Sequence, residues 1–264
     1  MKKLLTICIL ILFVKGFSQD NYFLGKTNYC TPQKQDSKKD FEMAILALQF
    51  PKYYGGVTNL MMKVVKEDST YCDAHFMAGY LFRLQDMHKE ALVMYYIADS
   101  LSQNKAPIFK QNLAVQYMKF GKVEKARKKY EEIIKYFPGD PEGYYGVANT
   151  ALVLEDYDKG IENLKKAEER YNYIGSVKMD VKYMFGALYC LKEAYDEALP
   201  YLDEAYPTYK KDENYLALYA LTQIKVGRKK SDEKLIKKAQ KTFDKIKNKN
   251  IAENISGKLK KEFS

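Results

Sequence analysis

The chain has 264 residues, with 44 Lys and Arg, 34 Asp and Glu, and 2 His. The excess positive charge is concentrated at one end, because residues 225–264 hold 14 basic and 5 acidic residues. A general nucleic-acid-binding protein carries a basic face on its folded domain, so this distribution argues against that class. Four cysteines, with Cys8 inside an N-terminal apolar run, are too few and too scattered for a disulfide-rich scaffold.

The N-terminus has the pattern of a secretory signal peptide. Two lysines follow Met1, an apolar run extends from Leu4 to Val14, and small residues precede a cleavage point after Ser18. The apolar run is shorter than the roughly 20 residues that a transmembrane helix needs. We therefore expect residues 1–18 to be removed, and the mature protein to be periplasmic or secreted. In such an oxidising compartment Cys30 and Cys72 can form a disulfide; the alternative is that both remain free thiols.

A short pattern recurs along the middle of the chain. Four segments each contain a turn followed by the first residues of a helical pattern, with the same number of residues between the two. They are 86–91, 121–126, 155–160 and 193–198. The small residue that closes each segment (Ala91, Ala126, Gly160, Ala198) recurs at intervals of 35, 34 and 38 residues. A fixed period of this length is typical of solenoid proteins.

These segments resemble the tetratricopeptide family, a helix-turn-helix repeat of 34 residues. Lys110 and Lys182 depart from the family pattern, because each occupies a slot that is usually bulky and apolar. The family's signature positions are best matched within residues 107–140, by Leu113, Ala114, Tyr117, Ala126, Tyr130, Ile133 and Pro138. The resemblance implies an all-α fold, a right-handed α-solenoid of stacked antiparallel helix pairs with a capping helix at its C-terminal end.

The repeat spacing also predicts the organisation of the chain. An irregular arm at 19–36 precedes an array at 37–212, with about five helix pairs at 37–70, 72–105, 107–140, 141–174 and 179–212. Residues 213–264 form a degenerate repeat and a basic cap. In it we expect one helix at 215–226, a polar loop at 227–232, a second helix at 235–247, and a final helix with an apolar stripe of Ile251, Ile255, Leu259 and Phe263.

The resemblance also implies a binding site. In the family, the first helix of each pair lines a concave groove, and a few of its positions point into that groove. The matching residues here are Phe76, Tyr80, Arg83, Gln111, Val115, Met118, Tyr145, Asn149, Leu152, Tyr183 and Ala187. Tyrosines combine large apolar contact with a hydrogen-bonding tip, as in protein-binding hot spots. The alternative for each tyrosine is packing between neighbouring repeats.

We expect no catalytic site, metal site or cofactor. His75 falls on a core position of its helix, and no Cys or His cluster has metal-ligand spacing. The sequence therefore predicts a non-catalytic protein-protein interaction scaffold of the cell envelope that binds a protein or peptide segment of unknown identity. Two alternatives are a glycan-binding helical protein and an adaptor whose basic C-terminus contacts anionic membrane surfaces; neither a nucleic-acid partner nor a transmembrane segment is expected.

Overall fold

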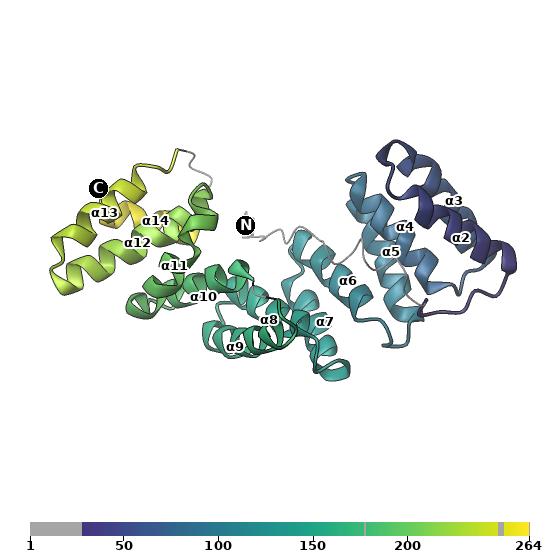
Figure 1. The fold of residues 1–264 in the computed structure, drawn as a ribbon, viewed down its shortest axis with the longest axis horizontal. Coiled ribbons are helices and arrows are strands. Elements are labelled where there is room, and N and C mark those ends of the chain that lie inside the picture. The colour runs from purple at the N-terminus through teal and green to yellow at the C-terminus, as the bar shows by residue number, and fades with distance from the viewer. Residues whose placement is uncertain (1–27, 177, 248–250, 264) are drawn as a thin grey trace, which may run out of the picture. The chain divides into compact units, whose positions relative to one another are not determined.

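The computed structural model describes residues 28–176, 178–247 and 251–263. The expected signal peptide at 1–18 and the first part of the expected arm, residues 19–27, lie outside these ranges. All regular structure in the described ranges is helical, and successive helices pack against one another as pairs (Figure 1). The chain divides into two compact units with a boundary between Pro138 and Gly139, and each unit is described by itself.

Within its described residues, the N-terminal unit holds three helix pairs. They are α2 (Gln35–Ala47) with α3 (Tyr54–Glu67), α4 (Cys72–Leu84) with α5 (His88–Leu101), and α6 (Pro107–Lys119) with α7 (Val123–Tyr136). A short 3₁₀ turn, η1 (Pro51–Tyr53), precedes α3. Proline at the start of α6 fits the first helical turn, where no intrahelical N–H bond is lost.

The described part of the C-terminal unit holds three further pairs and a final helix. The pairs are α8 (Pro141–Leu154) with α9 (Tyr157–Tyr173), α10 (Met179–Leu191) with α11 (Tyr195–Tyr209), and α12 (Glu213–Lys230) with α13 (Glu233–Phe243), and α14 (Glu253–Phe263) follows. Asp140, Asp212 and Asp232 cap α8, α12 and α13 through side-chain oxygens that accept backbone N–H bonds. Among the described helices, none combines the length and the apolar character that a membrane span requires.

The recurring turn of the sequence is a recurring helix terminus. In five pairs a residue with positive φ follows the first helix within two residues: Asp86 (59°), Gly121 (66°), Glu155 (57°), Glu193 (67°) and Ser231 (51°). The next residue donates its N–H to a carbonyl five positions earlier, at 2.8–3.1 Å in all five turns. This left-handed closure satisfies the last carbonyls of the helix and reverses the chain for the second helix. The period of the sequence is therefore the period of this turn.

The small residues of the repeat lie where two helices approach most closely. Ala91, Ala126 and Ala198 are completely inaccessible to solvent. A Cβ added at Gly186 would lie 2.5 Å from the Cγ atom of Leu202, a buried side chain of the partner helix. Side chains larger than hydrogen or methyl at these positions would separate the paired helices, because protein interiors have no spare volume.

The prediction of a polar loop at 227–232 is wrong. Helix α12 continues through Lys230, and Ser231, which has a φ of 51°, caps its end. Gly227 is a packing position inside the helix: its added Cβ would lie 2.9 Å from the Ile236 side chain of α13. Lys229 and Lys230 then pair with Asp196 at 2.6 and 2.8 Å. Glycine and lysines resemble a loop in sequence, but here they permit close packing and supply surface ion pairs.

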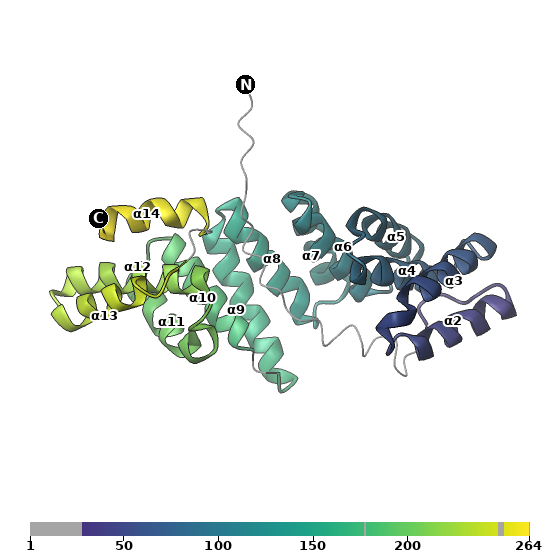
Figure 2. The ribbon, with the colours of Figure 1, turned by 90° about the horizontal axis from the view of Figure 1, so that it is seen from above.

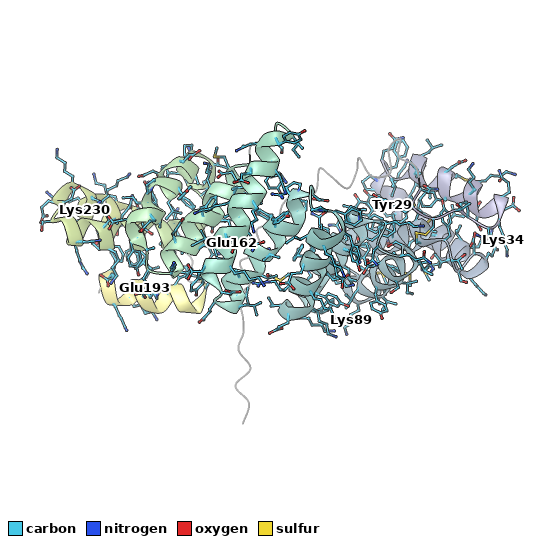
Figure 3. The ribbon with its side chains drawn as sticks, turned by 90° about the horizontal axis from the view of Figure 1, so that it is seen from below. Tyr29, Lys34, Lys89, Glu162, Glu193 and Lys230 are labelled. Atoms are coloured by element: carbon cyan, nitrogen blue, oxygen red, sulfur yellow. A yellow bond between two sulfur atoms is a disulfide. The ribbon has the colours of Figure 1, made fainter. Side chains whose placement is uncertain are left out.

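Helix α14 packs against α12 and lies along one side of the C-terminal unit (Figures 1 and 2). Its apolar stripe is buried at Ile255 and Leu259, which are 0 % and 2 % exposed. The Phe263 ring stacks on that of Phe243 with 4.4 Å between centroids. Lys258 pairs with Glu193 at the α10–α11 turn, which Figure 3 marks. The stripe therefore covers apolar surface that the last pair would otherwise expose, as end caps of repeat arrays do.

Substituting Gly186 by alanine tests the close approach of α10 and α11. Glycine to alanine inside a helix ordinarily stabilises by about 0.5–1 kcal/mol. Here the new methyl group overlaps Leu202, so we expect a net loss of about 1–3 kcal/mol in the free energy of unfolding. Urea denaturation measures it. Gly56→Ala is the matched control, because no atom lies within 4 Å of its added Cβ; a higher urea midpoint for Gly186→Ala would contradict this packing.

Candidate functional site

The expected groove positions of the N-terminal unit lie on α4 and α6. Phe76 is inaccessible to solvent, and its ring lies 4.5 Å from that of Phe109 and 5.3 Å from that of Tyr95. Tyr80 is also buried, with the Arg83 guanidinium 5.1 Å from its ring centroid. These residues form an aromatic cluster that joins α4, α5 and α6.

The remaining expected positions of this unit differ in exposure. Met118 is buried, whereas Arg83 and Gln111 are half-buried. Val115 is 40 % exposed. Of the six positions expected on α4 and α6, Val115 alone presents a clearly exposed side chain.

The expected positions of the C-terminal unit lie on α8 and α10. Tyr145, Leu152, Tyr183 and Ala187 are all buried, and Asn149 is half-buried. The Tyr183 ring lies 4.8 Å from the Tyr209 ring, on the second helix of the same pair. The Tyr183 ring therefore packs between helices, which was the alternative to binding. Only its hydroxyl group is left to bind a partner.

Two polar atoms at these positions have no hydrogen-bond partner in the described part of the chain. They are the hydroxyl oxygen of Tyr183 on α10 and the side-chain carbonyl of Asn149 on α8. Burial raises the pKa of Tyr183 well above its ordinary value, and the nearby carboxylate of Asp212 raises it further. The hydroxyl group stays protonated, so it can both donate and accept a hydrogen bond.

Tyr183 belongs to a cluster of tyrosine rings. Its ring lies 5.3 Å from that of Tyr215, and Tyr215 contacts Tyr206, Tyr209 and Tyr219. Other hydroxyl groups of the cluster donate to acceptors inside the unit: Tyr209 to Asp180, Tyr219 to Asp203 and Tyr215 to the Leu202 carbonyl. The unpartnered hydroxyl of Tyr183 is therefore an exception among its neighbours.

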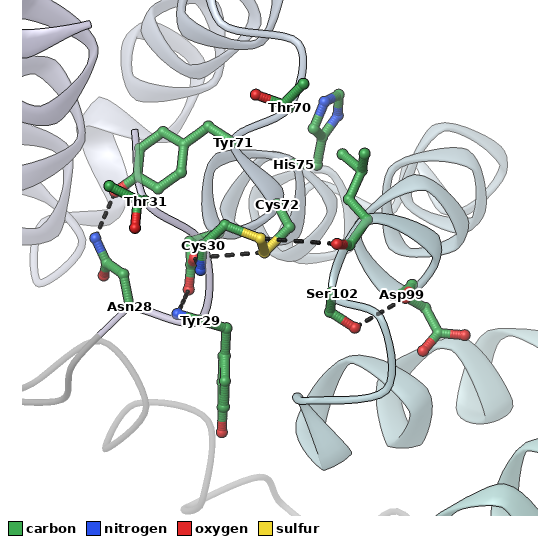
Figure 4. The surroundings of a disulfide bond; sticks show 12 residues. Asn28, Tyr29, Cys30, Thr31, Thr70, Tyr71, Cys72, His75, Asp99 and Ser102 are labelled. Carbon is green, nitrogen blue, oxygen red and sulfur yellow. Dashed lines mark hydrogen bonds between the residues drawn. A yellow bond between two sulfur atoms is a disulfide. The ribbon is translucent and has the colours of Figure 1, made fainter. Parts of the chain in front are cut away.

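The described part of the N-terminal arm is attached to α4. Cys30 and Cys72 form a disulfide with 5.7 Å between their Cα atoms. The backbone N–H groups of Tyr29 and Cys30 donate to the buried carboxylate of Asp73, at 3.1 and 2.8 Å. The Tyr29 ring points away from the disulfide (Figure 4) and packs edge-on against Phe109 at 5.3 Å. Residues expected to form a loose arm are therefore held in place from Asn28 onward.

The described residues bring together one group with metal-ligand atoms, formed by Cys30, Cys72 and Asp73. Both sulfur atoms belong to the disulfide, so neither is the thiolate that a metal requires. Asp73 already accepts two backbone N–H bonds. This group is a covalent attachment of the arm.

His75 is buried with its Nε2 atom 3.0 Å from the Ser69 carbonyl, and burial lowers its pKa.

A second polar region, which the sequence did not indicate, is an ion network between α5, α6 and α7. Lys110, which is 1 % exposed, contacts Asp99 at 2.9 Å and Glu132 at 2.8 Å. Lys129 contacts the same two carboxylates, each at 2.8 Å. The sequence showed only that Lys110 occupies a usually apolar slot. Its acidic partners come from two other helices, so their proximity follows from the tertiary structure.

The network shifts the pKa of its members. Burial by itself favours neutral Glu132, but hydrogen bonds from Lys110 and Lys129 outweigh it and lower the pKa of Glu132. Burial likewise opposes the charge of Lys129, but the hydrogen bonds that its ammonium group donates to Asp99 and Glu132 raise its pKa overall. Both shifts stabilise the ionised pairs at neutral pH.

Glu132→Gln tests this network through pH. A carboxyl group with a depressed folded pKa stabilises the protein above its unfolded pKa, here near 4.5, and loses that contribution as the pH falls through the folded value. We expect the variant to be about 1–3 kcal/mol less stable at pH 7 and equal to the wild type well below pH 4. Urea denaturation across this range measures the difference. Glu131→Gln, at an exposed neighbour, is the control, and a pH-independent deficit would contradict the network.

No known family profile matches the sequence, and no curated protein matches it. Solved structures do match. YrrB, described as a tetratricopeptide-repeat protein with an unusual peptide-binding site, is 16 % identical with a TM-score of 0.57, over 76 % of this chain and 97 % of that one. A tetratricopeptide-repeat protein from Parabacteroides merdae is 15 % identical with a TM-score of 0.60, over 88 % of this chain and 100 % of that one.

A chain of the APC/C hetero-tetramer Cut9–Hcn1 is also similar, at 18 % identity and a TM-score of 0.62, over 86 % of this chain and 43 % of that one. Identities this low show the fold alone. The structural likeness agrees with the successive helix pairs of the two units. The chain therefore has the tetratricopeptide-repeat fold, an all-α solenoid of helix pairs.

Proposed function

We propose that this protein is a non-catalytic scaffold that binds a protein or peptide segment at the groove positions of α8 and α10. The observation that carries the proposal is the pair of unpartnered polar atoms on these helices, the Tyr183 hydroxyl group and the Asn149 side-chain carbonyl. A buried polar group without a partner costs about 1–3 kcal/mol. A bound segment that supplies the missing hydrogen bonds would recover that free energy.

The chemistry of the two groups fits an extended polypeptide backbone. The Asn149 carbonyl accepts a hydrogen bond from a backbone N–H, and the Tyr183 hydroxyl can donate to a backbone carbonyl. Tyr209 is half-buried, so the edge of the tyrosine cluster faces solvent, and Asn149 on α8 is half-buried as well. The rings around Tyr183 offer apolar contact to side chains of the segment. The likeness to YrrB, whose description names a peptide-binding site, supports a ligand of this class.

The titratable groups of the described residues support a role without catalysis. Burial raises the pKa of the Cys190 thiol to about 11, and the side chain is inaccessible, so it is a poor nucleophile. Burial lowers the pKa of His75, whose ring bonds to a carbonyl of its own unit. Cys190 and His75 are therefore poor candidates for the nucleophile or base of an enzymatic site.

The basic C-terminal end gives less support to a membrane adaptor. Lys225 and Arg228 pair with Glu262, and Lys229 and Lys230 share Asp196. Exposed pairs of this kind contribute little to stability, but they reduce the local positive charge that anionic lipid would attract. The glycan alternative has the tyrosine cluster in its favour and no observation that distinguishes it from a peptide site.

We further propose that the protein is exported and acts in the periplasm or outside the cell. The signal-peptide pattern at 1–18 supports this, and so does the bridge between Cys30 and Cys72, since stable disulfides are rare in reducing cytosol.

Mass spectrometry of the protein isolated from its native cells tests its export. We expect the intact mass of a chain that begins at Gln19 and contains one disulfide, with Cys190 as the free thiol. Peptide mapping without reductant should recover Cys30 and Cys72 in one linked peptide. A retained N-terminus, or two alkylatable thiols at Cys30 and Cys72, would contradict export or the bridge respectively.

Tyr183→Phe combined with Asn149→Ala tests the binding site. Peptides selected on the immobilised wild-type protein from a random display library should bind the double variant about tenfold more weakly, because two hydrogen bonds are lost. Tyr183→Phe keeps the buried ring and should leave thermal stability unchanged or higher. Alanine is unsuitable at Tyr183, because truncating a buried aromatic side chain costs about 3–5 kcal/mol.

The matched control is Tyr173→Phe, which removes the same atom from a side chain that is 92 % exposed. It should bind the selected peptides as the wild type does. Equal affinity of the wild type and the double variant, or no enrichment of any peptide, would contradict a peptide site on α8 and α10.

A further inference from the structure

The N-terminal unit contains a cavity of about 410 Å³ beside the ion network of α5, α6 and α7. Its volume lies within the range of small-molecule sites, about 300–1,000 Å³. Its walls contain four lysines, two carboxylates and four uncharged residues. They are Lys110, Lys128, Lys129, Lys135, Asp99, Glu132, Ser100, Gln103, Asn104 and Tyr136.

The cavity wall has an excess of positive charge. The carboxylates of Asp99 and Glu132 each bond to both Lys110 and Lys129. An ammonium group has three N–H donors, so two donors of each lysine are used in this way. Lys128 and Lys135 have no carboxylate partner among the described residues. Two positive charges at the rim are therefore left for a negatively charged group from outside.

Two features show that the wall is more than a solvated surface. Lys110 is 1 % exposed, and burying an ammonium group costs several kcal/mol unless charged partners surround it. Gln103 and Asn104 have φ values of 49° and 64°, so two consecutive non-glycine residues of the wall adopt the left-handed conformation. Strained backbone of this kind gathers at functional sites.

We propose that this cavity binds a compact anionic group, a phosphate or a carboxylate. Lys128 and Lys135 contact it from the rim, while Lys110 and Lys129 contribute their remaining N–H donors from the wall. Tyr136 places its ring at the same site, with the Lys135 ammonium 5.0 Å from its centroid. Three of the four lysines lie on α7, the second helix of its pair, so this site is separate from the groove positions and does not depend on the proposed peptide site.

The test titrates the full chain with inorganic phosphate, with citrate and with a capped tetra-aspartate peptide, at constant ionic strength, by isothermal titration calorimetry. Lys128→Gln combined with Lys135→Gln removes two rim charges without touching the buried pairs. We expect saturable binding to the wild type and at least about tenfold weaker binding to this variant, since charge-assisted hydrogen bonds are lost. Lys119→Gln with Lys122→Gln makes the same change in net charge outside the cavity and should bind as the wild type does.

The probes distinguish the source of the anionic group. Tighter binding of phosphate or citrate indicates a free small anion, and tighter binding of the peptide indicates acidic side chains of a protein. Either result supports the site if the variant with Lys128→Gln and Lys135→Gln loses that binding. The absence of saturable binding by all three probes, or equal affinity in the rim and control variants, would overturn the proposal, whatever the outcome at α8 and α10.

Discussion

The structure depends on the close approach of two helices within each pair. A left-handed residue such as Glu193 reverses the chain, and a small residue five positions later, Ala198, lies against the preceding helix with no solvent-exposed surface. Gly186 shows how tight this approach is, because an added Cβ would overlap Leu202. Because the two helices are close together at these points, the large side chains between the points fill the space between the helices. They bury the apolar surface that stabilises each unit.

The same close packing brings polar groups together inside the protein. Lys110 occupies a slot that is usually apolar, and the structure tolerates it because Asp99 and Glu132 arrive from neighbouring helices. Without both partners the buried ammonium would destabilise the fold. The unpartnered hydroxyl of Tyr183 has no such compensation inside the unit. One unit therefore contains an ion network beside a cavity, and the other contains an unpartnered hydroxyl group in the tyrosine cluster.

The Cys30–Cys72 disulfide adds a covalent constraint to a fold that otherwise relies on contacts between neighbouring helices. It holds the chain before α2 against α4, where Asp73 also binds the backbone of Tyr29 and Cys30. Closing a loop of this length restricts the unfolded chain and so stabilises the folded one. Disulfides of this kind persist in oxidising compartments and are rare in reducing cytosol.

The sequence pattern predicted the helix pairs, their turns and the small residues between them, because these follow from a local period that recurs in the chain. It also predicted the apolar stripe of the last helix at Ile255, Leu259 and Phe263, but it was wrong to include Ile251, which precedes α14. Local pattern failed at Gly227, where a glycine followed by lysines has the composition of a loop but packs inside a helix against Ile236. The tertiary structure alone decided which groove residues are buried, which acids surround Lys110, and that Tyr183 lacks a partner, since these depend on contacts between segments far apart in the sequence.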